Sequence, residues 1–551
     1  MNEHKNVKPI IGLTAVCALA VAIGIWVGAS LEQKREEAKP KNPVLEGAVQ
    51  KFEDVLIHVE CDYVDDTDLQ TLSETAIGDL MKQLDPHSTY LTARELSLSN
   101  IELQGELEGI GIEFVMLHDT AYVIAPIGGG PAEQVGVRAG DKIIRVDDKD
   151  FAGQGLKQVE VTTQLRGAKG TKVKLTVKRD NKEELLDFII TRDKVPFYSV
   201  DVSYMVDSQI GYIKVSRFTA NTFKEFKTAF HSLQKQGMTK LLLDLRGNPG
   251  GYMDAAIKVA NDLLDQGQLI VYTKGKASKY TTKYYAKGGD KFDRCPVIVL
   301  IDEGTASAAE IVAGALQDND RALIVGRRSF GKGLVQIPIP LHDGSQLRLT
   351  VARYYTPSGR FIQKPYGEGV PDYHSDLISR YKQGEYFHAD NIQFDDALKH
   401  QMSKGRTVYG GGGIMPDYFV PIEARAHATY LDQLQAKNIL QQYALEYVDR
   451  HREALTAMGY EGYYDRFEVS DLMLKKIVAQ ADKAGVSYDG RALCTTKTHM
   501  KLLLKAYIAR NIWRAQGFYP IYHQSDEEFQ KALQLFDEAA TLIPKTTIDE
   551  E

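Results

Sequence analysis

The sequence has few cysteines, and this limits the classes of protein it can belong to. Its 551 residues include four, Cys17, Cys61, Cys295 and Cys494, which lie far apart in the chain. This spacing excludes a zinc-finger arrangement and does not indicate a disulfide framework, although a bond between two of them stays open. We expect no metal site and no organic cofactor.

An excess of positive charge is also lacking. The 67 Lys and Arg residues against 74 Asp and Glu give a net charge of −7 at pH 7. A net acidic chain is poorly suited to the negative phosphate backbone of nucleic acid, so we expect no nucleic-acid partner. With 43% hydrophobic and 26% charged residues the composition is that of a globular protein, and the length predicts about two to four domains.

Charge is missing altogether from residues 9–31, PIIGLTAVCALAVAIGIWVGASL. At about 1.5 Å per residue, a helix of this segment is long enough to cross a bilayer. Lys5 and Lys8 precede it and favour a cytoplasmic N-terminus. We expect an uncleaved, single-pass anchor in the cell inner membrane, with cleavage after Ala29 as the alternative. The rest of the chain is then on the periplasmic, extracytoplasmic side.

The patterns that follow divide the chain into regions. After the anchor or signal sequence (1–31) we expect a polar linker (32–43), a helical N-terminal region (44–104), a β-rich module (105–193), an α/β region (194–420) and a helical C-terminal region (421–551). In the last region we expect packing or dimerisation. Residues 525–528 match a capping box and predict a helix with Phe529, Ala532, Leu533 and Phe536 on one face.

The β-rich module begins with GIGIEFVM, a strand interrupted by glycines, and ends with KVKLTVKR as its predicted last strand. Its order of strands and short helices resembles a PDZ domain, with GIGI as the carboxylate-binding loop: Gly109, Ile110, Gly111 and Ile112. Backbone N–H groups freed by glycines can hold a C-terminal carboxylate, and a strand edge can pair with an extended peptide. The alternative is a glycine-rich hairpin without a ligand.

The α/β region alternates apolar strands with amphipathic helices. QIGYIKVSRF, KLLLDLRG, CPVIVLID and ALIVGR are the predicted strands, and the β-α-β-α-β order predicts a sheet that is at least partly parallel. In such sheets, reactive groups gather where strands end and helices begin. Two loops of this kind stand out, RGNPGG (246–251) and DEGTASAAE (302–310).

The second loop contains a hydroxyl, Ser307, at a predicted strand-to-helix turn. Free N–H groups at helix N-termini suit a developing oxyanion, so both loops could stabilise one beside Ser307. The alternative is that Ser307 is small only because the backbone is crowded at this turn.

A serine nucleophile needs a base, and no histidine lies in either loop or the strands that follow before His342. Lys332, in SFGKGLVQ, is the candidate, and Gln336 follows at an even offset that would place both side chains on one face of a strand. To act as a base, Lys332 needs a pKa lowered by roughly three units, or about 4 kcal/mol, through burial. The alternative is an ordinary solvated charge.

Residues 85–88, Asp-Pro-His-Ser, form a third group of polar side chains. We interpret them as a turn before a capped helix. A catalytic Asp–His–Ser cluster is the alternative, but adjacent residues point their side chains in different directions.

Taken in order, LDPHSTYL, the PDZ-like module, LLLDLRGNPGG, GTASAAE, SFGKGLVQ and ARYYTPSGRFIQ resemble the carboxy-terminal processing (tail-specific) proteases, from about residue 84 to 419. The resemblance implies a catalytic dyad of Ser307 and Lys332 supported by Gln336. It also implies an oxyanion hole from the N–H of Ala308 and of Gly250 or Gly251. Thr305 and Ala309 depart from the usual serine-rich string, and the tail beyond 421 is not covered.

The resemblance implies an α/β protease core with a mixed, partly parallel sheet, an inserted PDZ domain, helical terminal regions and one N-terminal membrane-spanning helix. The implied activity is serine endopeptidase cleavage of extracytoplasmic proteins with apolar C-terminal tails. A homodimer through the helical terminal regions and an adaptor protein stay open. The alternative function is a catalytically inactive PDZ-type scaffold. A histidine-based hydrolase is disfavoured because G-x-S-x-G is absent.

Overall fold

The computed structural model describes residues 42–96, 105–117, 119–179, 182–288, 294–367, 369–393, 395–402, 405–422 and 428–543. Contacts divide the chain into two compact units, residues 1–79 and 80–551. The predicted membrane helix, residues 9–31, lies outside the described residues. Within the described ranges, no helix has both the length and the apolar character needed to cross a membrane.

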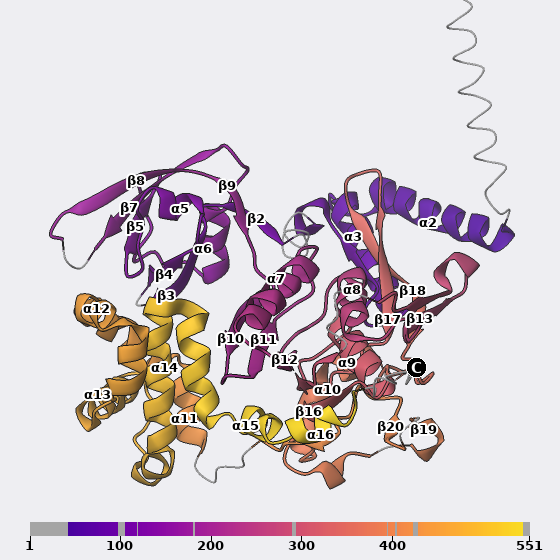
Figure 1. Ribbon diagram of the computed structural model, residues 1–551. Helices are drawn as coiled ribbons and strands as arrows, with labels where there is room; N and C mark the ends of the chain where they lie inside the picture. Colours follow the sequence, from indigo (N-terminus) through magenta and orange to yellow (C-terminus); the bar gives the residue numbers. More distant parts are fainter. Residues whose placement is uncertain are drawn as a thin grey trace, which may run out of the picture. The chain divides into compact units, whose positions relative to one another are not determined.

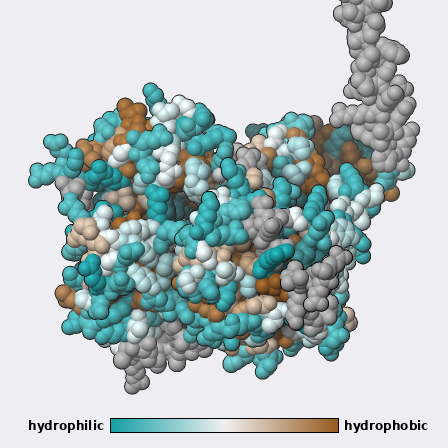
Figure 2. All heavy atoms as spheres, viewed as in Figure 1, coloured by the Kyte–Doolittle hydropathy of each residue, from teal (hydrophilic) through white to brown (hydrophobic). Residues whose placement is uncertain are grey.

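The first unit is helical, as predicted for this region. Asn42 caps the N-terminus of helix α2 (Pro43–Asp62), since its side chain accepts the N–H of Val44. Helix α3 (Leu69–Lys82) follows after a short connection and extends past the end of this unit. Large apolar side chains of α2 are exposed, among them Val44, Val49, Phe52 and Val55. Figure 2 shows hydrophobic residues at the surface in the region of this helix.

The second unit is built on a mixed six-stranded sheet. Its strands, in spatial order, are β10 (Val200–Met205), β11 (Ile210–Val215), β12 (Lys240–Asp244), β15 (Val297–Ile301), β16 (Ala322–Gly326) and β21 (Tyr418–Phe419). Only the β10–β11 pair is antiparallel, and the other four pairs are parallel. The prediction of a partly parallel sheet is confirmed.

Helices cover both faces of this sheet (Figure 1). One face packs against α7 (Thr222–Lys235), α8 (Met253–Leu263) and α9 (Ala308–Asp318), and the other against α15 (Glu527–Leu533) and α16 (Phe536–Ala540). Leu241 and Leu243 of β12 are buried with the first set and Leu242 with the second. Each such side chain contributes about 1.5–3 kcal/mol, which explains why these strands are apolar on both faces.

A second sheet adjoins the first. It contains β1 (Thr89–Leu91), β18 (Gln346–Tyr355), β13 (Leu269–Gly275) and β14 (Thr282–Tyr285), and β17 (Leu334–Pro340) pairs with β18. Helix α10 (Val370–Lys382) and a small ladder of β19 (Lys399–Gln401) and β20 (Thr407–Tyr409) follow in sequence.

The β-rich module is a separate antiparallel sheet with two helices. Its strands are β3 (Ile112–Leu117), β4 (Thr120–Pro126), β5 (Lys142–Val146), β7 (Lys172–Lys178) and β8 (Leu185–Thr191), with β6 (Lys149–Asp150) beside β5 and the helices α5 (Pro131–Gln134) and α6 (Gln158–Leu165). The prediction that β7 is the last strand is wrong, because β8 pairs with it along its whole length.

The first predicted strand of the module, residues 109–116, is confirmed only from Ile112 onward, because its first residues belong to β2 and to a turn. β2 (Glu106–Gly109) pairs with β9 (Asp193–Pro196) outside the main sheet, and β3 begins only after a turn at Gly111, where φ is +76°. Glycine permits this left-handed backbone without strain.

The C-terminal region contains α11 (Ala428–Ala436), α12 (Ile439–Arg466), α13 (Asp471–Lys483) and α14 (Gly490–Tyr522). The capping box predicted at 525–528 is wrong. Asp526 caps α15, since its Oδ1 accepts the N–H of Phe529 at 3.1 Å, and Glu528 binds arginines instead. The helix ends at Leu533, so Phe536 belongs to α16.

Candidate active site

Ser307 lies at the turn between β15 and α9, where the sequence predicts it. Its backbone has φ +54° and ψ −114°, a conformation that side-chain-bearing residues rarely adopt. Such strain costs on the order of 1–3 kcal/mol and is concentrated at functional sites. The N–H of Ser307 donates to Glu310 Oε2 at 2.8 Å, which holds the turn in place.

Glu310 is fully buried and joins this turn to the loop that contains Lys332. Its Oε2 accepts the N–H of Ser307 (2.8 Å) and of Lys332 (2.9 Å), and its Oε1 accepts Ser329 Oγ (2.6 Å) and the N–H of Gly331 (2.7 Å). Burial raises the pKa of Glu310, against these hydrogen bonds, which lower it. Sequence reasoning missed this residue, although a Glu three positions after a serine at a helix start is a capping signal.

Tyr354 of β18 binds the same two residues from the carbonyl side. Its hydroxyl lies 3.1 Å from the carbonyl oxygen of Ser307 and 2.6 Å from that of Lys332. Burial raises the pKa of Tyr354 well above its usual value, so the phenol stays neutral and remains a donor. The backbone N–H groups of Ser307 and Lys332 thus donate to the same oxygen of Glu310, and their carbonyl groups accept from the same hydroxyl of Tyr354.

The RGNPGG loop lies directly against the serine. Gly250 has φ +97°, and a Cβ there would lie 2.7 Å from Ser307 Cβ and 2.9 Å from the nitrogen of Ala308. The N–H of Gly250 donates to Asn248 Oδ1 at 2.8 Å. Ala308 is the first residue of α9, so its N–H has no partner within the helix. The N–H of Gly250 is therefore already paired, and the oxyanion hole formed by Ala308 with Gly250 or Gly251 stays a prediction.

The two departures from the family's string are both accommodated. Thr305 is buried and its hydroxyl donates to the carbonyl of Leu245 at 2.9 Å, which ties the two loops together. Ala309 is buried in the core between the sheet and the helices.

Lys332 is in an environment that suits a base. Burial lowers the pKa of its amine, against the charges of Glu310 and Asp85, which raise it, while the charge of Arg348 lowers it further. Among the described hydrogen bonds, none joins Lys332 Nζ to Ser307 Oγ. The structure thus brings the two residues together through Glu310 and Tyr354 and does not show the proton-transfer contact itself.

Gln336 contacts Thr350 rather than Lys332 in the described hydrogen bonds. Its Nε2 donates to Thr350 Oγ1 at 3.0 Å, and Thr350 Oγ1 donates to Asp85 Oδ1 at 3.0 Å. The argument from an even strand offset is wrong. β17 begins only at Leu334, and its register shifts between Val335 and Gln336. The support of Lys332 by Gln336 stays a prediction.

The turn predicted at residues 85–88 is confirmed, but the helix expected directly after it is wrong, because strand β1 begins at Thr89. Asp85 Oδ1 accepts the N–H groups of His87 and Ser88, each at 2.8 Å, and its Oδ2 accepts Ser88 Oγ at 2.6 Å. His87 Nε2 lies 2.7 Å from the Tyr373 hydroxyl, and burial, aided by the charge of Lys332, lowers the pKa of His87 to about 3. The group acts as a structural turn that holds Thr350, not as a catalytic triad.

The four predicted peptide-binding residues connect β2 to β3. Ile110 is buried, its carbonyl accepts the N–H of Ala132 at 2.8 Å, and the carbonyl of Gly111 accepts that of Ile127 at 2.9 Å. Gly109 ends β2 and Ile112 begins β3. The loop is therefore anchored through its carbonyl groups beside the N-terminus of α5.

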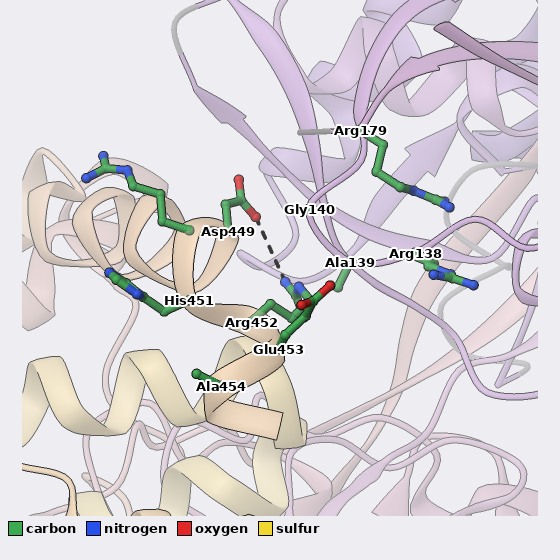
Figure 3. Close-up of a pocket in the computed structure, with 10 residues that line it drawn as sticks. Arg138, Ala139, Gly140, Arg179, Asp449, His451, Arg452, Glu453 and Ala454 are labelled. Carbon is green, nitrogen blue, oxygen red and sulfur yellow. Dashed lines mark ion pairs between the residues drawn. The ribbon is translucent and has the colours of Figure 1, made fainter. Parts of the chain in front are cut away.

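A cavity of about 610 Å³ lies elsewhere, between the β-rich module and α12 (Figure 3). Arg138, Gly140 and Arg179 line it from the module, and Asp449 and Arg452 from α12. None of the predicted catalytic residues lines it. Within the described ranges, no group of three or more His, Cys, Asp or Glu residues is placed to hold a metal ion.

A strained serine beside a glycine-rich loop, a half-buried lysine and a PDZ-like module define a serine hydrolase with a peptide-binding domain. The profile of peptidase family S41 matches residues 209–375, that of the PDZ domain residues 109–190, and that of a family of unknown function (DUF8443) residues 430–514.

Individual relatives agree with these profiles. A carboxy-terminal-processing protease of Bartonella bacilliformis is 43% identical over 317 residues, covering 57% of this chain and 72% of the relative. A probable CtpA-like serine protease of Staphylococcus aureus is 36% identical over 378 residues, covering 68% and 72%. The solved photosystem II D1 C-terminal processing protease is 32% identical over 56% of this chain and 88% of that one, with a TM-score of 0.31. The chain belongs to the carboxy-terminal-processing serine proteases of peptidase family S41.

Proposed function

We propose that this protease cleaves extracytoplasmic proteins at or near their C-termini through an acyl-enzyme formed on Ser307, with Lys332 as the base. One observation carries the assignment. Ser307, held at positive φ, and Lys332 donate their N–H groups to the same oxygen, Glu310 Oε2, at 2.8 and 2.9 Å. Residues 25 positions apart are thus fixed as one unit at the end of the sheet, where such chemistry is expected.

In the proposed reaction, the neutral amine of Lys332 accepts the proton of Ser307 Oγ as this oxygen attacks the carbonyl carbon of the peptide. The carbonyl oxygen becomes an oxyanion that accepts hydrogen bonds from the N–H groups of Ala308 and Gly251. Lys332 then gives its proton to the leaving amine and the C–N bond breaks. Water hydrolyses the ester in the second half and restores Ser307.

Substrate capture is proposed to occur at the PDZ domain. The loop of Gly109 to Ile112 leads into β3, whose edge can pair with an extended peptide. The N–H groups of this loop can donate hydrogen bonds to a terminal carboxylate. The uncharged segment 9–31 supports an inner-membrane anchor with the protease on the periplasmic side. Protein tails are the expected partners, and a homodimer or an adaptor stays open.

The test is cleavage of an unstructured protein presented in two forms that differ only in their last residues. Ser307→Ala and Lys332→Ala should each abolish cleavage without lowering the melting temperature. Matched controls are Ser278→Ala and Lys279→Ala, which remove the same groups from exposed positions and should cleave normally. Peptidase activity retained in either catalytic variant would remove the basis of the assignment.

A further inference from the structure

Two arginines beside the candidate site are bound by carboxylates from the C-terminal region. Arg246 belongs to the loop that continues to Gly250, and Arg327 lies between β16 and the loop of Lys332. Glu528, in the first turn of α15, binds both of them. Its Oε2 accepts Arg246 Nη1 at 2.6 Å, and its Oε1 accepts Arg327 Nη1.

Each arginine is also held by a carboxylate of the core. Asp244 Oδ2 accepts Arg246 Nη2 at 2.7 Å, and Glu303 Oε2 accepts Arg327 Nε at 2.8 Å. Asp526 adds a contact to Arg246 Nη1 at 2.8 Å. The arginines therefore lie between carboxylates of the core and carboxylates of α15.

This cluster is removed from water. The exposed fraction is 13% for the Arg246 side chain, 11% for Arg327 and 9% for Glu528. Buried ion pairs of this kind contribute little net stability, because desolvation offsets the attraction, whereas removing one partner leaves an uncompensated charge. A role in fixing geometry accounts for such a cluster better than a role in stability alone.

The cluster is not needed to attach α15 to the sheet. Phe529 and Ala532 of α15, with Phe536 of α16, are already buried against the apolar side chains of β12, β15 and β16. The charged first turn adds contacts to the two catalytic loops rather than to the sheet. We call residues 246–251 the oxyanion loop and residues 327–333 the lysine loop. The distinct effect of Glu528 is to connect the first of these, through Arg246, to the second, through Arg327.

We propose that Glu528, assisted by Asp526, is a positioning residue of the protease site that fixes the oxyanion loop and the lysine loop relative to each other. It rests on the proposed function, because it assigns to the C-terminal region the alignment of that same site. A displacement of about 1 Å between catalytic groups can cost roughly 100-fold in rate. Glu528 acts through Arg246 and Arg327 and does not contact substrate.

The test compares full-length Glu528→Gln with Glu527→Gln, which removes the same charge from an exposed position in the same helical turn. We expect kcat of the first to fall by about 10- to 100-fold with KM for the tailed substrate nearly unchanged, and the second to match wild type. The double variant Arg327→Gln with Glu528→Gln should have a kcat only slightly lower than that of either single variant, because both substitutions break the same ion pair. Equal kcat for the two glutamine variants, or additive losses in the double variant, would overturn the proposal.

Hydrogen exchange separates this proposal from the proposed function. In Glu528→Gln the amides of residues 246–251 and 327–333 should exchange faster than in Glu527→Gln, while those of the β-rich module should not change. If wild type shows no Ser307-dependent cleavage, the proposed function fails, and unchanged exchange in both loops overturns the positioning role independently. If Glu528→Gln does not fold, Arg327→Lys, which keeps the charge but loses the planar fork, replaces it in both measurements under the same expectations.

Discussion

Gly250 offers the sharpest test of how the oxyanion loop meets the serine. We consider Gly250→Ala, which adds one methyl group. The new Cβ would lie 2.7 Å from Ser307 Cβ and 2.8 Å from the carbonyl oxygen of Ala306. Carbon atoms pack about 3.5–4.0 Å apart, so the loop and the serine must separate by about 1 Å.

The expected magnitude has two parts. A side chain at the positive φ of this residue costs about 1–2 kcal/mol in backbone strain, and overpacking typically adds about 1–3 kcal/mol to the loss of stability. The separation of about 1 Å should lower kcat by roughly 100-fold, which corresponds to about 2.7 kcal/mol in the activation barrier. Stability and activity should therefore both fall.

Gly247→Ala in the same loop separates strain from displacement. Gly247 also has a positive φ, +68°, but a Cβ there meets no atom within 4 Å. Gly247→Ala should therefore lose only the stability that backbone strain costs, about 1–2 kcal/mol, and should keep kcat near that of wild type. Both variants are assayed for kcat and KM with an unstructured tailed protein and for the free energy of unfolding in urea. If kcat of Gly250→Ala lies within about threefold of that of Gly247→Ala, the loop does not press on the nucleophile as described.

Two further predictions concern Lys332 and Glu310. Because only the neutral amine of Lys332 accepts a proton, kcat/KM should rise with pH through the lysine's pKa. Arg348→Gln removes a positive charge that lowers the pKa of Lys332, so the rising limb of the pH profile should move to higher pH. The control Arg353→Gln, on the same strand, should leave the limb in place. A limb that does not move in Arg348→Gln would contradict the role of Lys332 as the base. Glu310→Gln replaces one buried carboxylate oxygen, which accepts two hydrogen bonds, by an NH₂ group that can only donate. At about 1–3 kcal/mol for each unmade bond, the free energy of unfolding in urea should fall by roughly 2–6 kcal/mol. Most of the activity should be lost as well. Glu160→Gln alters the corresponding capping contact in the exposed first residues of α6 and should cost less than about 1 kcal/mol. Equal losses in the two variants would show that burial of Glu310 is unimportant.

The parts of the fold that sequence predicted well are those with a strong local pattern. Apolar runs such as LLLD and VIVLI are buried strands in the parallel part of the sheet, as their pattern predicts. The position of Ser307 follows from the same pattern. The apolar strand ends before it and a helix begins after it, which places Ser307 at the strand-to-helix turn. These features depend on neighbours within a few residues, which is why a single sequence contains them.

The contacts that were missed depend on residues distant in sequence. Tyr354 resembles any aromatic residue of a strand, and only the crossing of β18 beneath two loops places its hydroxyl against the carbonyl groups of Ser307 and Lys332. The even-offset argument for Gln336 failed for a related reason. It assumed a regular strand from Lys332 onward, and an irregularity between Val335 and Gln336 cannot be inferred from the side chains alone.

The first turn of α15 shows how a correct local signal can be assigned to the wrong partner. A serine followed three residues later by a glutamate favours a reciprocal cap, in which the carboxylate turns back to its own helix. Here Asp526 takes the capping role, and this leaves the carboxylate of Glu528 for two arginines more than 200 residues earlier in the chain. A charge-assisted bond to a buried guanidinium is stronger than one to an exposed backbone N–H. A buried arginine in each catalytic loop is therefore sufficient to redirect the glutamate, and sequence spacing alone cannot reveal that competition.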